Sequence, residues 1–220
     1  MFRWYQKASR CYVYLADVLY YQNRAELDWR SAFRSSRWFS RGWTLQELLA
    51  PKIVDFYSRD RIRIGDKHSL GYQIMTITGI PADALGTSDL TKFEVDERFA
   101  WVANRQTTRN EDIAYCLLGI FDVYMPLIYG EGAAIAQRRL RREIQEKEPA
   151  PLLGLRDGPK STGGGAASLI SPRKEAYVAV IGQSGSGKSS FVRALTGGDV
   201  RINHGLYSCM FSRMTPSSFG

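Results

Sequence analysis

The segment R-W-F-S-R-G-W-T-L-Q-E-L-L-A-P, from Arg37 to Pro51, carries the strongest structural signals of the chain. It holds two of the five tryptophans and a glycine between an arginine and a tryptophan. The pattern predicts a bend at Gly42 and a short helix from Thr44 to Ala50 that Pro51 ends. Thr44 and Glu47 have the spacing of a capping box. A carboxylate held at the mouth of a pocket is the alternative role for Glu47.

Four sequence blocks in one order resemble fungal heterokaryon-incompatibility (HET) domains. The segment above supplies R-x-W-T-L-Q-E-L-L-A-P. The other blocks are F-R-W-Y-Q-K-A-S-R-C-Y-V-Y-L-A-D-V at Phe2 to Val18, T-T-R-N-E-D-I-A-Y-C-L-L-G-I-F-D-V at Thr107 to Val123, and P-L-I-Y-G-E-G at Pro126 to Gly132. The resemblance extends from Met1 to about Glu148.

This resemblance implies an α/β fold like that of Toll/interleukin-receptor domains, mostly helical in the part present. It implies a module that triggers cell death when a nonself partner is sensed, with recognition proteins or further copies of the chain as partners. Some relatives of that fold cleave NAD with a glutamate, and Glu47 is the candidate catalytic residue. Complete HET domains place further strands upstream, so we expect this chain to lack the N-terminal half of the domain.

Composition narrows the function classes. The chain has 220 residues and a net charge of +8. Its one basic run, Arg138 to Arg142, falls on a predicted helix and indicates a solvated face, so no nucleic acid is expected as a partner. Three cysteines without a disulfide pattern indicate a reducing, cytoplasmic compartment. No apolar run approaches the roughly 20 residues that span a bilayer, so we expect no membrane span.

Periodicity and end signals predict the elements of the first part. Asp96 is the expected cap of one helix, and Asp17, just past the first strand, is either a turn residue or a ligand. Only two strands are expected in this part, and no further strand is predicted beside them. The predicted helices are Met1 to Ser9, Asp66 to Thr78, Val95 to Asn104, Asn110 to Phe121 and Gly130 to Glu148, and the predicted strands are Cys11 to Leu15 and Ile53 to Tyr57.

A change in composition divides the chain. Residues 1–148 form the HET-like part, residues 149–174 are rich in glycine and proline and predict a flexible linker, and residues 175–220 begin a second module. There the strand Tyr177 to Ile181 runs into a complete phosphate-binding loop, and a helix is expected from Ser190 to Leu195. The predicted nucleotide-binding residues are Gly182, Gln183, Ser184, Gly185, Ser186, Gly187, Lys188, Ser189 and Ser190.

This loop predicts Mg²⁺ and GTP or ATP as cofactors. Its backbone N–H groups would surround phosphate oxygens, Lys188 would reach the β- and γ-phosphates, and the Ser189 hydroxyl would ligate Mg²⁺. Hydrolysis needs a second acidic Mg²⁺ partner, and no apolar strand ending in aspartate follows. The tail from Asp199 to Met210 resembles the start of a fungal GTPase-type G domain, although Met210 stands where that family commonly has a threonine.

Together these features predict a vegetative-incompatibility protein in which a HET effector is coupled to the N-terminal fragment of a P-loop nucleotide-binding module. Two alternatives stay open. One is a P-loop NTPase whose residues 1–148 only bind partners, and the other is a nonfunctional gene fragment. Nucleotide hydrolysis and NAD cleavage are the candidate activities, and neither set of residues is complete in this chain.

Overall fold

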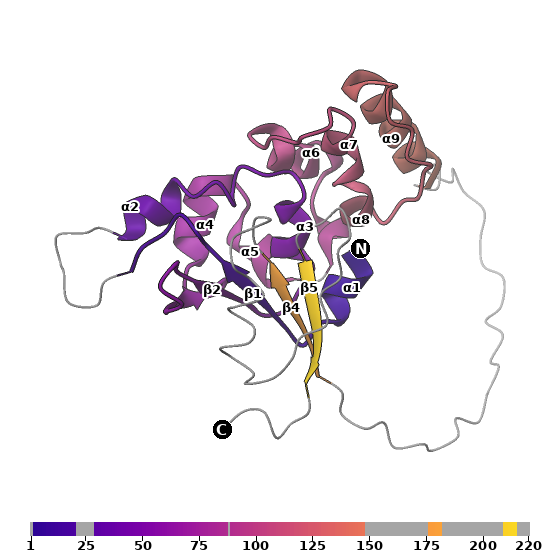
Figure 1. Ribbon diagram of the computed structural model, residues 1–220. Coiled ribbons are helices and arrows are strands. Elements are labelled where there is room, and N and C mark those ends of the chain that lie inside the picture. The colour runs from indigo at the N-terminus through magenta and orange to yellow at the C-terminus, as the bar shows by residue number, and fades with distance from the viewer. Residues whose placement is uncertain (1, 21–28, 88, 148–175, 182–208, 215–220) are drawn as a thin grey trace, which may run out of the picture.

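The computed structural model describes residues 2–20, 29–87, 89–147, 176–181 and 209–214, and these contain one five-stranded sheet in the order β3-β2-β1-β4-β5 (Figure 1). β1 is parallel to both β2 and β4, whereas β3 and β5 are antiparallel to their neighbours β2 and β4. The strands are β1 (Arg10–Tyr14), β2 (Val54–Tyr57), β3 (Arg63–Asp66), β4 (Ala176–Ile181) and β5 (Cys209–Met214).

Short helices account for most of the remaining described residues. α1 packs against α3 and α8, α2 packs against α4, and α9 packs against α7 (Figure 1). The helices are α1 (Phe2–Lys7), α2 (Trp29–Arg34), α3 (Thr44–Leu49), α4 (Gly71–Thr78), α5 (Ala82–Gly86), the 3-10 helix η1 (Leu90–Lys92), α6 (Val95–Ala103), α7 (Asp112–Tyr115), α8 (Leu118–Phe121) and α9 (Ala133–Lys147).

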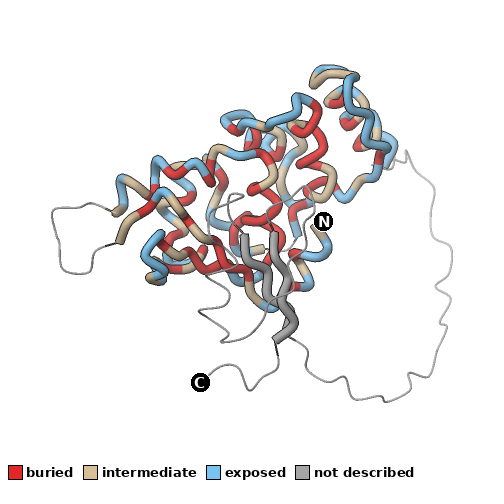
Figure 2. Tube along the Cα trace, in the orientation of Figure 1, coloured by how far each residue is buried: buried red, intermediate tan, exposed pale blue. Residues whose placement is uncertain are grey.

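One face of the sheet builds the main core, because alternate residues of a strand point to opposite faces. Phe56 of β2 is fully buried at the centre of this face. Its ring centroid lies 5.5 Å from those of Phe33 and Trp38, and 6.1 Å from that of Phe39. The aromatic rings therefore attach the start of the Arg37 to Pro51 segment to β2, and Figure 2 shows this central region as buried.

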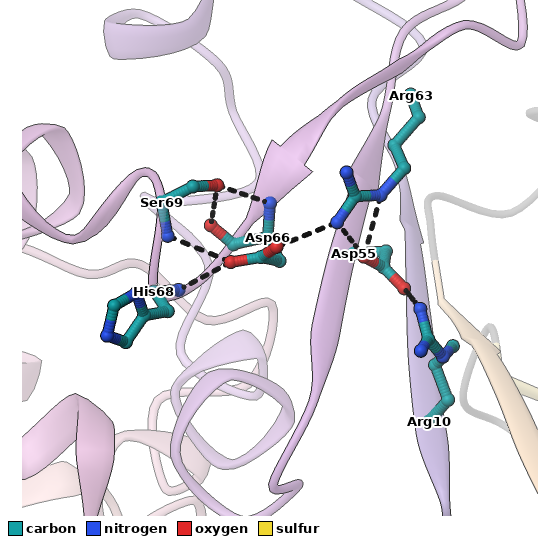
Figure 3. A network of polar contacts seen from close by, with 6 residues as sticks. All are labelled: Arg10, Asp55, Arg63, Asp66, His68 and Ser69. Carbon is teal, nitrogen blue, oxygen red and sulfur yellow. Dashed lines mark hydrogen bonds and ion pairs between the residues drawn. The ribbon is translucent and has the colours of Figure 1, made fainter.

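The opposite face of the sheet holds a buried carboxylate (Figure 3). Asp55 of β2 has no exposed surface and accepts hydrogen bonds from Arg10 Nη1 at 2.5 Å and from Arg63 Nε and Nη2 at 2.9 and 2.8 Å. Arg63 also donates to Asp66 at 2.7 Å. Charge-assisted bonds of this kind are about twice as strong as neutral ones. They link β1, β2 and β3 and so help to set the register of the three strands.

Most predicted elements of the first part are confirmed. The bend at Gly42 and the helix beginning at Thr44 occur, and the predicted end of a helix at Thr78 is confirmed, with Gly79 in the left-handed φ of 69° expected after it. The predicted start of that helix at Asp66 is wrong, because α4 begins at Gly71 and Asp66 is the last residue of β3. The β-strand at Tyr177 to Ile181 is also present as β4. Within the described residues, no helix has the length and apolarity needed to cross a membrane.

The prediction of one continuous helix from Asn110 to Phe121 is wrong. The structure has α7 and α8 instead, separated by Cys116 and Leu117. The Ile120 N–H bonds to Leu117 O at 2.9 Å, a tighter turn than that of an α-helix. This leaves the Cys116 carbonyl to accept a 2.7 Å bond from Gln46 Nε2. A tertiary hydrogen bond thus accompanies the break in the helix.

The expectation of two strands without neighbours is also wrong, because β2 pairs with β3 and β1 pairs with β2 and β4. The four-residue β3 is short and polar and gave no strand pattern. Asp96 does not cap α6, whose N-cap is Glu94. The β1–β4 pairing joins the first and third predicted segments in one sheet, and the division at residues 149–174 stays a prediction.

Candidate functional site

The Arg37 to Pro51 segment is fastened to the chain around residue 106 by backbone hydrogen bonds. Gly42 N–H donates to Gln106 O at 2.9 Å, and Gln106 N–H donates to Ser40 O at 2.6 Å. The two backbones approach so closely that a Cβ at Gly42 would lie 2.4 Å from Thr107 Cγ2. A side chain at this position would force one segment away from the other. We call the contact between residues 40–46 and 105–116 the clasp.

Arg105 supplies the charged part of the clasp. Its Nη1 donates to Arg41 O at 2.9 Å and to Thr44 Oγ1 at 2.8 Å, and its Nε donates to Trp101 O at 3.2 Å. Its Nη2 is buried and has no hydrogen-bond partner among the described residues. Burial lowers the pKa of Arg105 to about 10, against the opposing effects of Cys116 and Glu47. The guanidinium is therefore still charged at neutral pH.

Helix α3 and its N-cap residue Trp43 complete the clasp with their side chains. Trp43 Nε1 donates to Asp112 Oδ2 at 3.1 Å, and Gln46 Nε2 donates to the Cys116 carbonyl. The predicted capping box is wrong, because the N-cap is Trp43 and makes no side-chain cap bond. Thr44 is the first helical residue. Its hydroxyl lies 2.6 and 2.7 Å from the carbonyl oxygens of Trp38 and Arg41, so it holds the preceding turn instead.

Glu47 lies on α3 beside this network and is 9% exposed. Tyr5 Oη donates to its Oε1 at a long 3.4 Å, and its Oε2 has no hydrogen-bond partner in the part of the chain that the structure describes. Burial raises the pKa of Glu47 to about 7, with the positive charge of Arg41 as the largest opposing effect. The Trp38 indole N–H also lowers the pKa of Glu47, although its geometry does not meet that of a hydrogen bond. A carboxyl with this pKa can give or take a proton at neutral pH.

A pocket lies beside the clasp, with Ser40 and Arg105 among its lining residues. It has a volume of about 180 Å³, and Glu47 is not among the residues that line it. Its lining residues come from α2, the segment after it, α4 and the end of α6: Arg34, Ser35, Ser36, Arg37, Phe39, Ser40, Ile77, Thr78, Trp101, Asn104 and Arg105.

Asp17 follows β1 and fixes one wall of this pocket. Its Oδ1 accepts from Ser36 Oγ at 2.8 Å, and its Oδ2 accepts from the Arg37 backbone N–H at 2.9 Å. Both carboxylate oxygens are therefore engaged in positioning the start of the Arg37 to Pro51 segment. The structure supports a positioning role for Asp17 at the carboxyl end of β1.

The last two sequence blocks bind each other through Glu111. Its Oε1 accepts from the backbone N–H groups of Gly130 at 2.8 Å and Gly132 at 3.0 Å, and both glycines have positive φ. Bonds from its own N–H and from those of Gly132 and Gly130 lower the pKa of Glu111. Tyr115 Oη adds a 2.8 Å contact to Glu131 Oε1. These blocks therefore contain residues that hold one loop on α7.

The predicted phosphate loop, Gly182 to Ser190 with Lys188 and the Mg²⁺ candidate Ser189, lies outside the described residues. The strand before it is described. β4 ends at Ile181, which is in register with Val13 of the parallel strand β1. Met210 is part of β5 and pairs with Val180. The loop sequence therefore begins one residue after a strand whose carboxyl end lies at the same sheet edge as that of β1. Ligands of open α/β sheets bind at such edges.

Sequence reasoning missed four buried charges, those of Asp55, Arg98, Arg105 and Lys67. Lys67 is only 7% exposed. Its Nζ donates to Leu48 O at 3.4 Å and to Pro51 O, and so satisfies carbonyls at the end of α3. Burial lowers the pKa of Lys67 to about 8. All four positions look like surface charges in a single sequence, because their burial depends on partners far along the chain.

Comparison with curated proteins shows one clear relationship. The chain is 55% identical over 146 residues to "Vegetative incompatibility protein HET-E-1" of Podospora anserina. The match covers 66% of this chain and 11% of the relative, so the chain spans about a tenth of that protein. Over this region the chain is related to part of a fungal vegetative incompatibility protein.

The other two comparisons give no relationship. No protein-family model matches the sequence. No solved structure matches it either.

The pKa of Glu47 predicts how stability depends on pH. Between about 4.5 and 7 the folded chain retains a proton that the unfolded chain has released, so the free energy of unfolding falls as pH rises through this window. The difference between the two pKa values is worth on the order of 3 kcal/mol. The lowered pKa values of Asp66, Glu111 and Asp122 act below this window.

Glu47→Gln removes the titrating group, so its stability relative to wild type should rise by about 3 kcal/mol from pH 4.5 to 8. Urea unfolding of the full chain across this range measures the change. Glu94→Gln changes an exposed carboxylate without a partner in the described chain and should keep the wild-type slope. An unchanged slope in Glu47→Gln would assign the titration to another group.

Proposed function

We propose that this chain is part of a vegetative-incompatibility protein in which residues 1–148 are a cell-death effector module and the phosphate-loop segment is a nucleotide-binding regulator. The 55% identity over 146 residues to a vegetative incompatibility protein is the observation that carries this proposal. Nucleotide binding would act in the cytoplasm to assemble effector modules, together with nonself-recognition proteins or further copies of the chain.

The sheet geometry supports the nucleotide-binding part. β4 is parallel to β1, and its carboxyl end runs directly into Gly182 of the G-x-x-x-x-G-K-S sequence. A strand followed by this loop is the context in which successive N–H groups bind phosphates. Lys188 would bind the β- and γ-phosphates and Ser189 would ligate Mg²⁺, with GTP as the preferred nucleotide and ATP as the alternative.

Nucleotide binding tests this part of the proposal. Labelled GTP and labelled ATP are titrated into the full chain with Mg²⁺, and Lys188→Ala should weaken binding at least tenfold, a loss of about 1.4 kcal/mol. Lys160→Ala is the matched control, because it removes the same side chain outside the loop, and it should bind like wild type. Equal affinity of Lys188→Ala and wild type would show that the phosphate-loop assignment is wrong.

For the effector module, Glu47 is the proposed catalytic residue. Its carboxyl titrates near neutral pH, has one oxygen without a partner and lies next to buried Arg105. A second function, partner binding without catalysis, is favoured by its 9% exposure and its position away from the described pocket. The two functions predict different effects of a neutral, isosteric substitution.

Glu47→Gln in a fungal host that expresses the chain separates these functions. If Glu47 is catalytic, the variant should reduce killing at least tenfold while it remains folded at neutral pH, since removal of this carboxylate relieves the cost of burying a charge. Viable-cell counts measure the effect, and Glu94→Gln should kill like wild type. Full killing by Glu47→Gln would support partner binding and exclude a catalytic Glu47.

A further inference from the structure

The pocket beside the clasp has the lining of an anion site. Three arginines, Arg34, Arg37 and Arg105, contribute to it, and none of its lining residues is acidic. Two carboxylates lie near these arginines: Glu47 beside Arg105, and Asp17, which lies 3.7 Å from Arg37 Nε and already accepts two shorter hydrogen bonds. Positive charge therefore exceeds negative charge at this pocket.

Two buried donors belong to residues that line the pocket. Arg105 is 6% exposed and Trp101 is 3% exposed, and both residues are among those that line it. Arg105 Nη2 and Trp101 Nε1 make no hydrogen bond to any described residue. Leaving a buried donor unsatisfied costs about 1–3 kcal/mol, and more for a charged group. Two such donors at one pocket are what a bound acceptor would satisfy.

The outer arginines are free to bind as well. In the described chain, Arg34 and the Asn104 amide make no side-chain hydrogen bond or ion pair, and Arg37 meets Asp17 only through its Nε. The serine hydroxyls are already donating: Ser36 to Asp17, Ser35 to the Ser31 and Ala32 carbonyls, and Ser40 to the Arg37 carbonyl. The guanidinium groups would therefore provide most of the binding.

We propose that this pocket binds the phosphate group of a small phosphomonoester. Guanidinium groups match phosphate oxygens with paired, parallel hydrogen bonds. The volume of about 180 Å³ lies below the roughly 300–1,000 Å³ of pockets for drug-sized ligands, so a single phosphate with a small organic group fits better than a whole nucleotide. Phe39, Ile77 and Trp101 provide apolar surface for that organic group. The site is separate from the predicted phosphate loop.

Calorimetric titration of the full chain at low ionic strength tests the proposal, with inorganic phosphate and ribose 5-phosphate as probes. The Lys188→Ala background removes the contribution of the loop. Ribose 5-phosphate should bind saturably and more tightly than inorganic phosphate, and the double variant Arg34→Gln/Arg37→Gln should weaken it at least tenfold. Arg138→Gln changes an exposed arginine of α9 without a partner in the described chain; it removes one positive charge, as each single pocket variant does, and should leave binding unchanged.

Three results would overturn the site. If Arg138→Gln weakens ribose 5-phosphate binding as much as Arg34→Gln or Arg37→Gln alone, the binding reflects only attraction by net charge. Equal affinity for the two probes would exclude the phosphomonoester. If Lys188→Ala loses binding while Arg34→Gln/Arg37→Gln, with Lys188 intact, binds fully, the phosphate binds at the loop. That result would support the proposed nucleotide site and exclude the pocket beside the clasp.

Discussion

The close approach of two backbone segments at Gly42 is the constraint on which the described structure depends. The Gly42 N–H donates to Gln106 O and the Gln106 N–H donates to Ser40 O across the clasp, and a Cβ at residue 42 would clash with Thr107. This contact positions α3, whose Trp43 and Gln46 then reach Asp112 and the Cys116 carbonyl. The loop held by Glu111 follows from the placement of α7. One small residue thus couples three of the sequence blocks.

Buried charges also lie on and around α3. Arg105, Glu47 and Lys67 are all less than 10% exposed, and none of them forms a close ion pair with another described residue. Burying charges in this way costs free energy unless hydrogen bonds or ligands compensate. Hydrogen bonds to backbone carbonyls offset much of the cost of burying Arg105 and Lys67. For Glu47, burial raises the pKa to about 7, so the carboxyl is partly neutral at neutral pH. The arrangement gives α3 both a structural and a chemical role.

Local signals predicted what local physics controls. Gly42, Thr44 and Pro51 gave the bend, the start and the stop of α3, because backbone preferences act within a few residues. These local signals failed where contacts with residues far along the chain determine the structure. Gln46 Nε2 donates a hydrogen bond to the Cys116 carbonyl at the break between α7 and α8. The Thr44 hydroxyl donates to the Trp38 carbonyl and accepts from Arg105, and it does not cap the helix. The pocket joins residues about 70 positions apart, and no single stretch of sequence shows it.

The stability of Gly42→Ala tests the clasp most directly, with urea unfolding of the full chain as the measurement. Overpacking against Thr107 Cγ2 predicts a loss of about 1–3 kcal/mol, and Thr107→Ser in the same chain should restore much of it because the clashing methyl is removed while the hydroxyl stays. Gly71→Ala is the control, since a Cβ there would meet nothing within 4 Å. If Gly42→Ala is as stable as Gly71→Ala, the two segments do not meet as closely as described and the clasp does not hold the fold together.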